Sequence, residues 1–232
     1  MSLPVIAPTD FTGTIKISTD EFREDTFEDF ILEYYPLFVR QIIGDDAFIE
    51  AENNDFSRYN DLLLGTDYVD DEGKNQRWDG LVISIRKFIY FTYVRDNMET
   101  SRNGKVHGAS ANSERLTPSE VLNVAISRFT SGVISIKSGL PMFLDTYKEI
   151  TTTIISSSEV ATVYTLLVPS TLYLDEGLTV LIEDTEYAVT NVVLNTSFDL
   201  VDTTGKDFTG LTMEYKPFNK VDYTLPQAAL MI

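Results

Sequence analysis

The chain has 232 residues, of which 43% are hydrophobic, so it can bury the core of one or two folded domains. Its 36 acidic and 18 basic residues give a net charge of −18, which disfavours general attraction to nucleic acid or an anionic membrane. The sequence contains no cysteine, which excludes disulfides and thiolate metal sites.

Residues 1–19 are predicted to form an extended N-terminal arm. Pro4 and Pro8 disfavour a helix, and residues 12–17 alternate in the manner of a short strand or a docked extended segment. The start lacks the basic and apolar segments of a secretory signal, so we expect a soluble protein made in a reducing cytosol. Two interpretations of the arm stay open, because it could bind a neighbouring copy or lie on its own domain.

A helical domain is predicted over residues 20–150. The helical pattern starts after Thr19, and Pro36 is expected to end or kink the first helix. The pattern then continues to Gly44, which suits a C-terminal cap. Residues 45–64 are expected to form one or two short helices.

An acidic, turn-rich loop is predicted before the central helix. Asp67, Asp70, Asp71 and Glu72 supply the oxygen ligands that calcium prefers. Their spacing does not match an EF-hand, so we interpret the segment as a solvated acidic loop and predict no metal site.

Residues 77–98 are predicted to form a central helix that is apolar nearly all round. One stripe recurs at three- and four-residue spacing and runs from Trp78 to Tyr93. Ile83, Tyr90 and Val94 project on roughly the opposite side. Because a surface helix is apolar on one face only, this one is expected to pack on its own bundle and partly on a second element, for example a neighbouring subunit.

The polar loop that follows holds His107, the only histidine of the chain. A catalytic histidine needs a nucleophile or carboxylate held against it, and this loop of serines and glycines offers no such arrangement. We therefore predict no catalytic residue and no cofactor.

A further helix is predicted from Thr117, because Pro118 suits the first turn and Glu120 completes a capping box. Gly132, Gly139 and Pro141 are expected to interrupt it. The interruption would leave a last short helical piece before residue 150.

The pattern changes from helical to period two at about residue 150, so residues 151–232 are predicted to form a β-rich domain with a C-terminal tail. A hairpin is expected to turn near Glu183 and Asp184. The predicted fold class is α+β, with a helical bundle followed by an antiparallel β sandwich or small barrel. The strands are expected in six short runs: residues 151–155, 161–168, 178–182, 187–193, 198–201 and 211–215.

The charge is unevenly distributed along the chain. Residues 1–75 carry a net charge of −13, residues 76–136 carry +3 and the remainder carries −8. A basic segment between acidic segments suits charge-complementary packing, within one chain or between copies.

The order and spacing of residues 55–115 resemble head–tail connector proteins of tailed phages that infect Bacteroidetes, including the ring proteins of crAss-like phages. The resemblance covers about a quarter of the chain and has no single chemically diagnostic motif. The matching residues are Tyr59–Leu63, Gly65, Tyr68, Gly73, Trp78–Leu81, Phe88–Tyr93, Thr100 and Gly104.

The resemblance implies a structural virion protein that forms a ring, often of twelve copies, beneath the portal protein. Its partners would be further copies, the portal and neighbouring neck or tail proteins, and DNA would pass through the lumen without sequence-specific binding. It would be a component of the virion neck or tail, made in the bacterial host cytoplasm, with no membrane partner. The residues expected at subunit or portal contacts are Trp78, Tyr90, Phe91, Val94, Arg86, Arg95 and Arg102.

Two other classes stay open. The β-rich domain could bind a host surface in a tail or receptor-binding protein. A carboxylate-based hydrolase could use two of the many acids, although that reaction needs a pair about 5–10 Å apart, a distance that the sequence does not supply.

Overall fold

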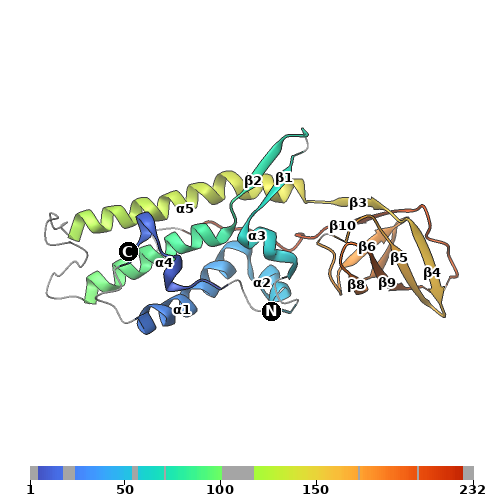
Figure 1. Cartoon of the computed structure of the whole chain (residues 1–232), viewed down its shortest axis with the longest axis horizontal. Coiled ribbons are helices and arrows are strands. Elements are labelled where there is room, and N and C mark those ends of the chain that lie inside the picture. Colours follow the sequence, from blue (N-terminus) through green and yellow to red (C-terminus); the bar gives the residue numbers. More distant parts are fainter. Residues whose placement is uncertain are drawn as a thin grey trace.

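The protein is α+β, as the sequence predicts, with helices before residue 147 and antiparallel strands after residue 149. Figure 1 shows a helical domain and a β domain lying end to end along the long axis of the molecule. The computed structural model describes residues 5–17, 24–53, 57–70, 72–100, 118–171, 173–202 and 204–226.

Helix α1 spans Glu24–Ile43 and passes through Pro36, so of the end or kink predicted at this proline the end is excluded. Proline removes one backbone donor, but the next turn is held by Phe38 and Val39, which are both buried. Gly44, with a φ of +86°, ends the helix, as the sequence predicts. The chain continues through α2 (Asp45–Asn53), the short 3₁₀ helix η3 (Ser57–Tyr59) and α3 (Asn60–Leu64).

Two long helices, α4 (Leu81–Thr100) and α5 (Pro118–Thr146), run antiparallel along the helical domain (Figure 1). Helix α5 is continuous, so the predicted interruption at Gly132, Gly139 and Pro141 is wrong. A Cβ atom at Gly132 would lie 2.7 Å from the ring of Phe88, and one at Gly139 would lie 2.7 Å from Trp78. The glycines therefore serve close packing of α5 on its neighbours and do not break the helix.

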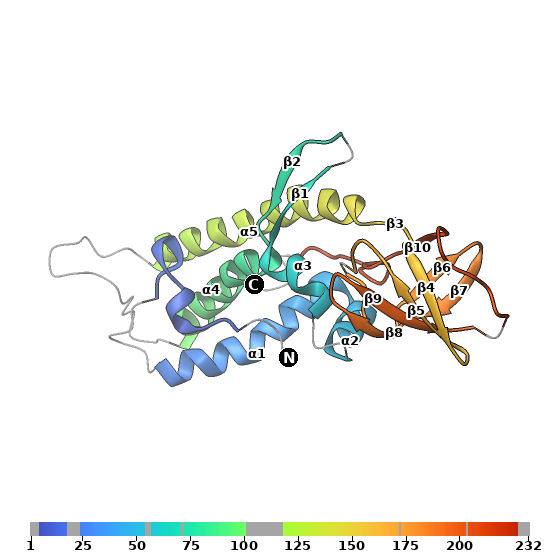
Figure 2. The ribbon, with the colours of Figure 1, turned by 45° about the vertical axis from the view of Figure 1, so that its right-hand side comes forward.

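The segment predicted as a loop forms a β-hairpin that projects from the helical domain (Figures 1 and 2). Its strands are β1 (Thr66–Val69) and β2 (Asn75–Trp78), which pair antiparallel. Gly65 and Gly80 have positive φ angles. The two segments of the chain that hold them cross so closely that a Cβ on either glycine would lie 2.4 Å from the backbone of the other segment. This crossing fixes the base of the hairpin.

The N-terminal segment packs on its own helical domain and contains no strand among residues 5–17. It forms two 3₁₀ turns, η1 (Pro8–Asp10) and η2 (Gly13–Ile15). Ile6 and Phe11 are buried in the helical core, and the Phe11 ring lies 4.8 Å from that of Phe27. Of the two interpretations of the arm, the structure shows the one in which it lies on its own domain, because two large apolar side chains are buried on the bundle. Where the alternation of residues 12–17 suggested a short strand, the chain forms a 3₁₀ turn.

The β domain consists of two four-stranded antiparallel sheets. The strand order is β3-β10-β6-β7 in one sheet and β4-β5-β9-β8 in the other. The strands are β3 (Ile150–Thr153), β4 (Ser156–Val160), β5 (Val163–Leu167), β6 (Thr179–Ile182), β7 (Thr185–Ala188), β8 (Thr190–Val193), β9 (Ser197–Val201) and β10 (Thr212–Tyr215).

At both edges the chain passes directly from one sheet into the other, so each edge strand of the first sheet is followed by an edge strand of the second. At one edge it passes from β3 to β4 at Ile154, which bonds to Leu211, and Ile155, which bonds to Leu167. At the other edge it passes from β7 to β8 at Val189. The sheets are thus joined on both sides, as in a small barrel, around one core that includes Phe198, Phe208 and Met213.

Each of the six predicted runs contains a strand, but two details differ from the sequence prediction. Residues 156–160, which were not predicted, form β4, and the run 187–193 is divided between two sheets. The hairpin at Glu183 and Asp184 is confirmed, and both residues have positive φ, the geometry of a type I′ turn.

The chain returns from the β domain to the helical domain after β10. Phe218 joins the helical core, and the amides of Asp222 and Thr224 donate to the carbonyls of Ile43 and Ile42. The domain division predicted at residue 151 is therefore crossed by the C-terminal segment. The apolar residues 228–232 lie outside the described residues.

Candidate interaction surfaces

The outward side of α4 carries a stripe of partly exposed side chains. Ile83, Lys87, Tyr90 and Val94 follow one another at helical spacing and lie on one face. Ile83 is 42% exposed, and the other three are half-buried. We call these four residues, together with Arg128 of α5, the α4–α5 face.

The α4–α5 face lies on the opposite side of α4 from helix α1. The rings of Phe88 and Tyr93 are turned toward α1, at 5.5 Å from Phe38 and 4.7 Å from Phe27. Helix α5 packs on the flank of α4 between these two sides, where Phe88 and Phe91 lie 4.7 and 5.1 Å from Phe129. The stripe is therefore left uncovered by the helix that packs under α4.

Two cations on this face, Lys87 and Arg128, form no ion pair with a described carboxylate, although the charge of Asp79 acts on Lys87. Lys87 Nζ donates to Ser131 Oγ at 3.1 Å, and burial together with the charge of Arg128 lowers the pKa of Lys87. Arg128 Nε is buried and has no hydrogen-bond partner in the described part of the chain. Neither cation forms an ion pair with a described residue. A partner with exposed carboxylates would therefore supply the ion pairs and the hydrogen-bond acceptor that this face lacks.

The predicted contact residues Tyr90 and Val94 lie on this face, whereas Trp78 and Phe91 do not. Trp78 is 2% exposed and its indole Nε1 donates to the carbonyl of Leu62 at 2.9 Å. Phe91 is 1% exposed and packs on Phe129, with 5.1 Å between ring centres. The expectation that these two rings contact another subunit is corrected, because α5 and α3 cover them within one chain.

The predicted arginines have partners in their own chain where the structure describes them. Arg86 lies 3.4 Å from Asp10, and Arg95 lies 2.6 Å from Asp96. Arg102 lies outside the described residues. Contacts with acidic groups of another subunit were predicted at these arginines. Lys87 and Arg128 were not predicted, because only the packing of α4 on α5 brings them together.

The outward side of α1 forms a second and chemically different face. Leu32 and Leu37 are 66% and 54% exposed, although both lie on a helix with a full buried side. Glu28, Asp29 and Glu33 are exposed beside them and form no ion pair with other described residues. Leu32 and Leu37 lie about 140° apart around the helix axis, so these five residues cover about half of its circumference. We call this outward side of α1 the α1 face. Its signal in the sequence is two leucines that fall outside the apolar period of the helix.

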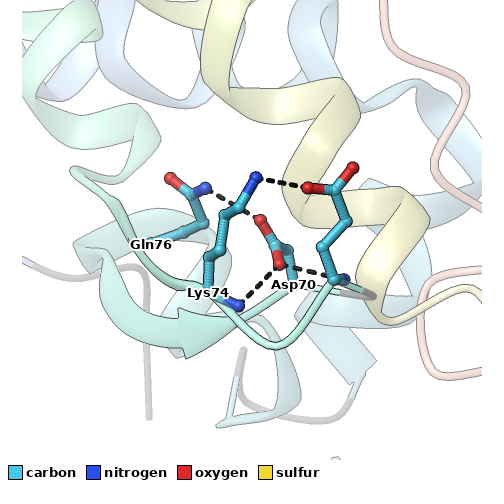
Figure 3. A network of polar contacts seen from close by, with 4 residues as sticks. Asp70, Lys74 and Gln76 are labelled. Atoms are coloured by element: carbon cyan, nitrogen blue, oxygen red, sulfur yellow. Dashed lines mark hydrogen bonds and ion pairs between the residues drawn. The ribbon is translucent and has the colours of Figure 1, made fainter.

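The tip of the projecting hairpin is organised by Asp70 (Figure 3). Its carboxylate accepts hydrogen bonds from the Gln76 side chain at 2.8 Å and from the backbone amides of Lys74 and Glu72 at 2.9 and 3.1 Å. These donors hold the pKa of Asp70 below its usual value. Both carboxylate oxygens thus bind protein donors, and no group of three metal-ligating side chains occurs among the described residues.

A buried ion pair lies where the two domains meet. Arg58 is 3% exposed, and its Nη2 lies 2.5 Å from Glu50 Oε2. Glu50 also accepts a hydrogen bond from Tyr59 at 2.9 Å and lies 3.2 Å from Lys220 Nζ. Burial alone would raise the pKa of Glu50, but these partners outweigh it and the pKa is lowered. Asp175 of the β domain lies 4.0 Å from Arg58 Nε.

Tyr173 completes the contact between the domains. Its hydroxyl donates to Asp61 at 2.7 Å, and its ring lies 4.9 Å from Tyr147 and 5.2 Å from Phe218. Burial raises the pKa of Tyr173, so the phenol stays protonated and keeps this bond. The two domains are therefore joined by buried rings as well as by charge.

A cleft of about 260 Å³ opens beside this junction and is lined in part by Glu50, Glu186, Glu214 and Lys216. A glycosidase-type reaction needs one carboxyl with a raised pKa to act as the acid. The structure instead lowers the pKa of Glu50 through its cationic partners. The chemistry at Glu50 is that of a structural ion pair.

No protein-family model matches the chain, and the search of curated proteins gave no significant match. No helix in the described parts of the chain is long and apolar enough to cross a membrane. The function is therefore inferred from the exposed faces described above and from the resemblance of residues 55–115 to head–tail connector proteins.

Proposed function

We propose that the protein is a structural component of a tailed-phage virion that forms an oligomeric ring of the head–tail connector beneath the portal. The ring would extend and seal the DNA conduit between the capsid and the tail. The connector resemblance of residues 55–115 supports this proposal, and the geometry of the helical domain gives it a physical basis.

The observation that carries the proposal is the presence of two separate apolar faces on one helical domain. The α1 face exposes Leu32 and Leu37, and the α4–α5 face exposes Ile83 beside the half-buried Tyr90 and Val94. A subunit of a ring needs two lateral contacts, one for each neighbour. Exposed apolar patches of this kind mark interaction sites in soluble proteins.

The proposed partners are further copies of the chain, the portal protein and adjoining neck or tail proteins. Duplex DNA would pass through the lumen without sequence-specific binding. The net charge of −18 supports that role, because acidic walls repel phosphates and keep the duplex from sticking. The proposed location is the neck or tail region of the virion, after synthesis in the bacterial host cytoplasm.

The test is image averaging of purified virions in which this protein carries a C-terminal tag. Tag density confined to the neck, between the capsid vertex and the tail, is the expected result. Density at the tail tip, or particles without the tag, would overturn the proposal.

A row of exposed valines favours a second candidate function, that of a tail or receptor-binding protein. Val160, Val163 and Val201 are directly paired across β4, β5 and β9 and point outward from the barrel. Such a row suits the binding of another surface. A trimeric mass and a label at the tail tip would select this candidate in place of the connector.

A further inference from the structure

We infer that copies of this chain bind one another head to tail, with the α1 face of one copy seated on the α4–α5 face of the next. This inference rests on the proposed ring, and it assigns the two surfaces that would form the lateral contact. The occupant of each face is thus a second copy of the same chain.

The two faces are complementary in charge. The α1 face presents Glu28, Asp29 and Glu33, and the α4–α5 face presents Lys87 and Arg128. Neither set is paired with other described residues of its own chain. Arg128 Nε is buried without a hydrogen-bond partner among the described residues, so a carboxylate from a neighbour would satisfy an otherwise costly group.

The faces are also complementary in apolar content. Leu32 and Leu37 stand out from α1, while Ile83, Tyr90 and Val94 form a shallow apolar stripe on α4. Each face combines apolar side chains with charge of one sign. A contact between unlike faces would bury at least one of the leucines and pair the charges together.

Arg128 and the acids of α1 lie at one level along the helical domain, whereas Ile83 and Lys87 lie nearer the start of α4. The ring of Phe30, next to the acids of α1, lies 5.3 Å from Tyr93, and Phe91 lies 5.1 Å from Phe129. Residues 28–33 of α1, the second half of α4 and the first half of α5 therefore occupy one end of the bundle (Figure 2).

This placement favours a closed ring. The two faces lie on opposite sides of α4, with Arg128 and the acids of α1 at one level, so rotation about an axis along the molecule brings the α1 face of one copy to the α4–α5 face of the next. A contact between two different surfaces closes into a ring when the rotation permits, whereas a contact of one surface with itself stops at a dimer.

The absence of cysteine allows a direct test by disulfide trapping in the full-length chain. Leu32→Cys and Val94→Cys place one thiol on each face. Under mild oxidation the double variant is expected to give a ladder of covalent multimers. Each single variant should stay monomeric, and a mixture of the two single variants should give dimers only. Dimers from one single variant alone would indicate a symmetric contact and would overturn the inference.

A matched control moves one thiol away from the α4–α5 face. Ile134 is 60% exposed on α5 but is not part of that face. Leu32→Cys combined with Ile134→Cys should therefore give no ladder. Equal ladders from the two double variants would show random collision and would contradict the assignment.

Charge reversal then tests the pairing itself in the Leu32→Cys, Val94→Cys background. Glu33→Lys or Arg128→Glu alone should lower the yield of multimers about tenfold, because like charges then face each other. The two reversals together should restore much of the yield, since the two changed positions again carry opposite charges. Lys137→Glu, an exposed lysine of α5 outside the face, should leave the yield unchanged.

The outcomes separate this inference from the proposed function. Neck density in virions without a disulfide ladder would overturn the assignment of faces and leave the connector proposal standing. A ladder from a protein that is absent from the neck would support head-to-tail binding and overturn the connector proposal.

Discussion

The helical domain and the β domain bury their apolar side chains in different ways. The two sheets of the β domain are joined on both sides and enclose one core, so that domain closes on itself. The helical domain leaves apolar side chains exposed on several helices, among them α1, α4 and α5. Exposed apolar side chains remain on both domains, as a row of valines on the closed barrel and as separate faces on the helices, so each domain leaves some apolar surface for a partner to cover.

The two cores also depend on different residues. In the helical domain, close approach is set by Gly132 and Gly139, which admit the rings of Phe88 and Trp78. In the β domain, strand alternation turns side chains such as Tyr164 and Leu166 inward, with no glycine required. Mutations can therefore disturb one domain while leaving the other folded.

The largest expected effect comes from removing a ring from the β core. Phe208 is fully buried and lies 5.1 Å from Tyr164 and 5.5 Å from Tyr187. Phe208→Ala should lower the free energy of unfolding of the β domain by about 3–5 kcal/mol, because it leaves a cavity. Hydrogen exchange should then accelerate in β5 and β9 far more than in α4 and α5. Equal acceleration in both domains would show one cooperative unit and break the comparison.

The next effect concerns the ion pair at the domain junction. Glu50→Gln removes the charge that balances the buried Arg58 and should cost about 3 kcal/mol at neutral pH, measured by denaturant unfolding. Glu50→Asp, which keeps the charge, is the matched control and should cost less. An equal loss for both variants would mean that packing rather than charge stabilises the junction.

The same carboxylate predicts a dependence of stability on pH. The folded protein lowers the pKa of Glu50. A lowered pKa means that the stabilisation is present above the pKa of the unfolded chain, about 4.3 for glutamate, and is lost as the pH falls through the folded value. The difference in unfolding free energy between wild type and Glu50→Gln should therefore shrink from pH 7 toward pH 3. A difference that stays constant would contradict the assignment of this stabilisation to the Glu50 carboxylate.

A smaller effect is expected at the contact between α4 and α5. Gly132→Ala places a methyl group 2.7 Å from a ring carbon of Phe88 and 3.2 Å from the carbonyl of Ser84. Overpacking should cost about 1–3 kcal/mol, partly offset by the roughly 1 kcal/mol better helix propensity of alanine. Thermal unfolding of the helical domain should shift downward. Ser127→Ala, at an exposed position of α5, is the control, and a stabilised Gly132→Ala would show that the ring yields easily.

The smallest effect is expected at the tip of the hairpin. Asp70→Asn removes the carboxylate that accepts bonds from the amides of Glu72 and Lys74, while leaving the buried base at Trp78 unchanged. Hydrogen exchange of these two amides should rise, and thermal unfolding of the whole protein should not shift. A shift in global unfolding would show that the projecting hairpin stabilises the body of the helical domain.

Local patterns in the sequence determined the fold class and several boundaries. The change from helical period to period two near residue 150 reflects the geometry of side chains on helices and strands, which acts over a few residues. Gly44 and the turn at Glu183 and Asp184 were predictable for the same reason, since backbone conformation at such points is a local property.

The tertiary structure decided the features that depend on distant neighbours. Pro36, Gly132 and Gly139 break helices by local rules, yet packing holds α1 and α5 intact across them. The hairpin before α4 was missed because its strands are mostly polar, and only the crossing of Gly65 and Gly80 fixes it.

The candidate contact faces divide in the same way. The excess of apolar surface on α4 was visible from its period, and Tyr90 and Val94 follow from it directly. The burial of Trp78 and Phe91, and the meeting of Lys87 with Arg128, depend on how α4 packs against α5 and α3. Helical period shows which residues share a side of one helix, but only packing between helices determines which of those sides remain open to a partner.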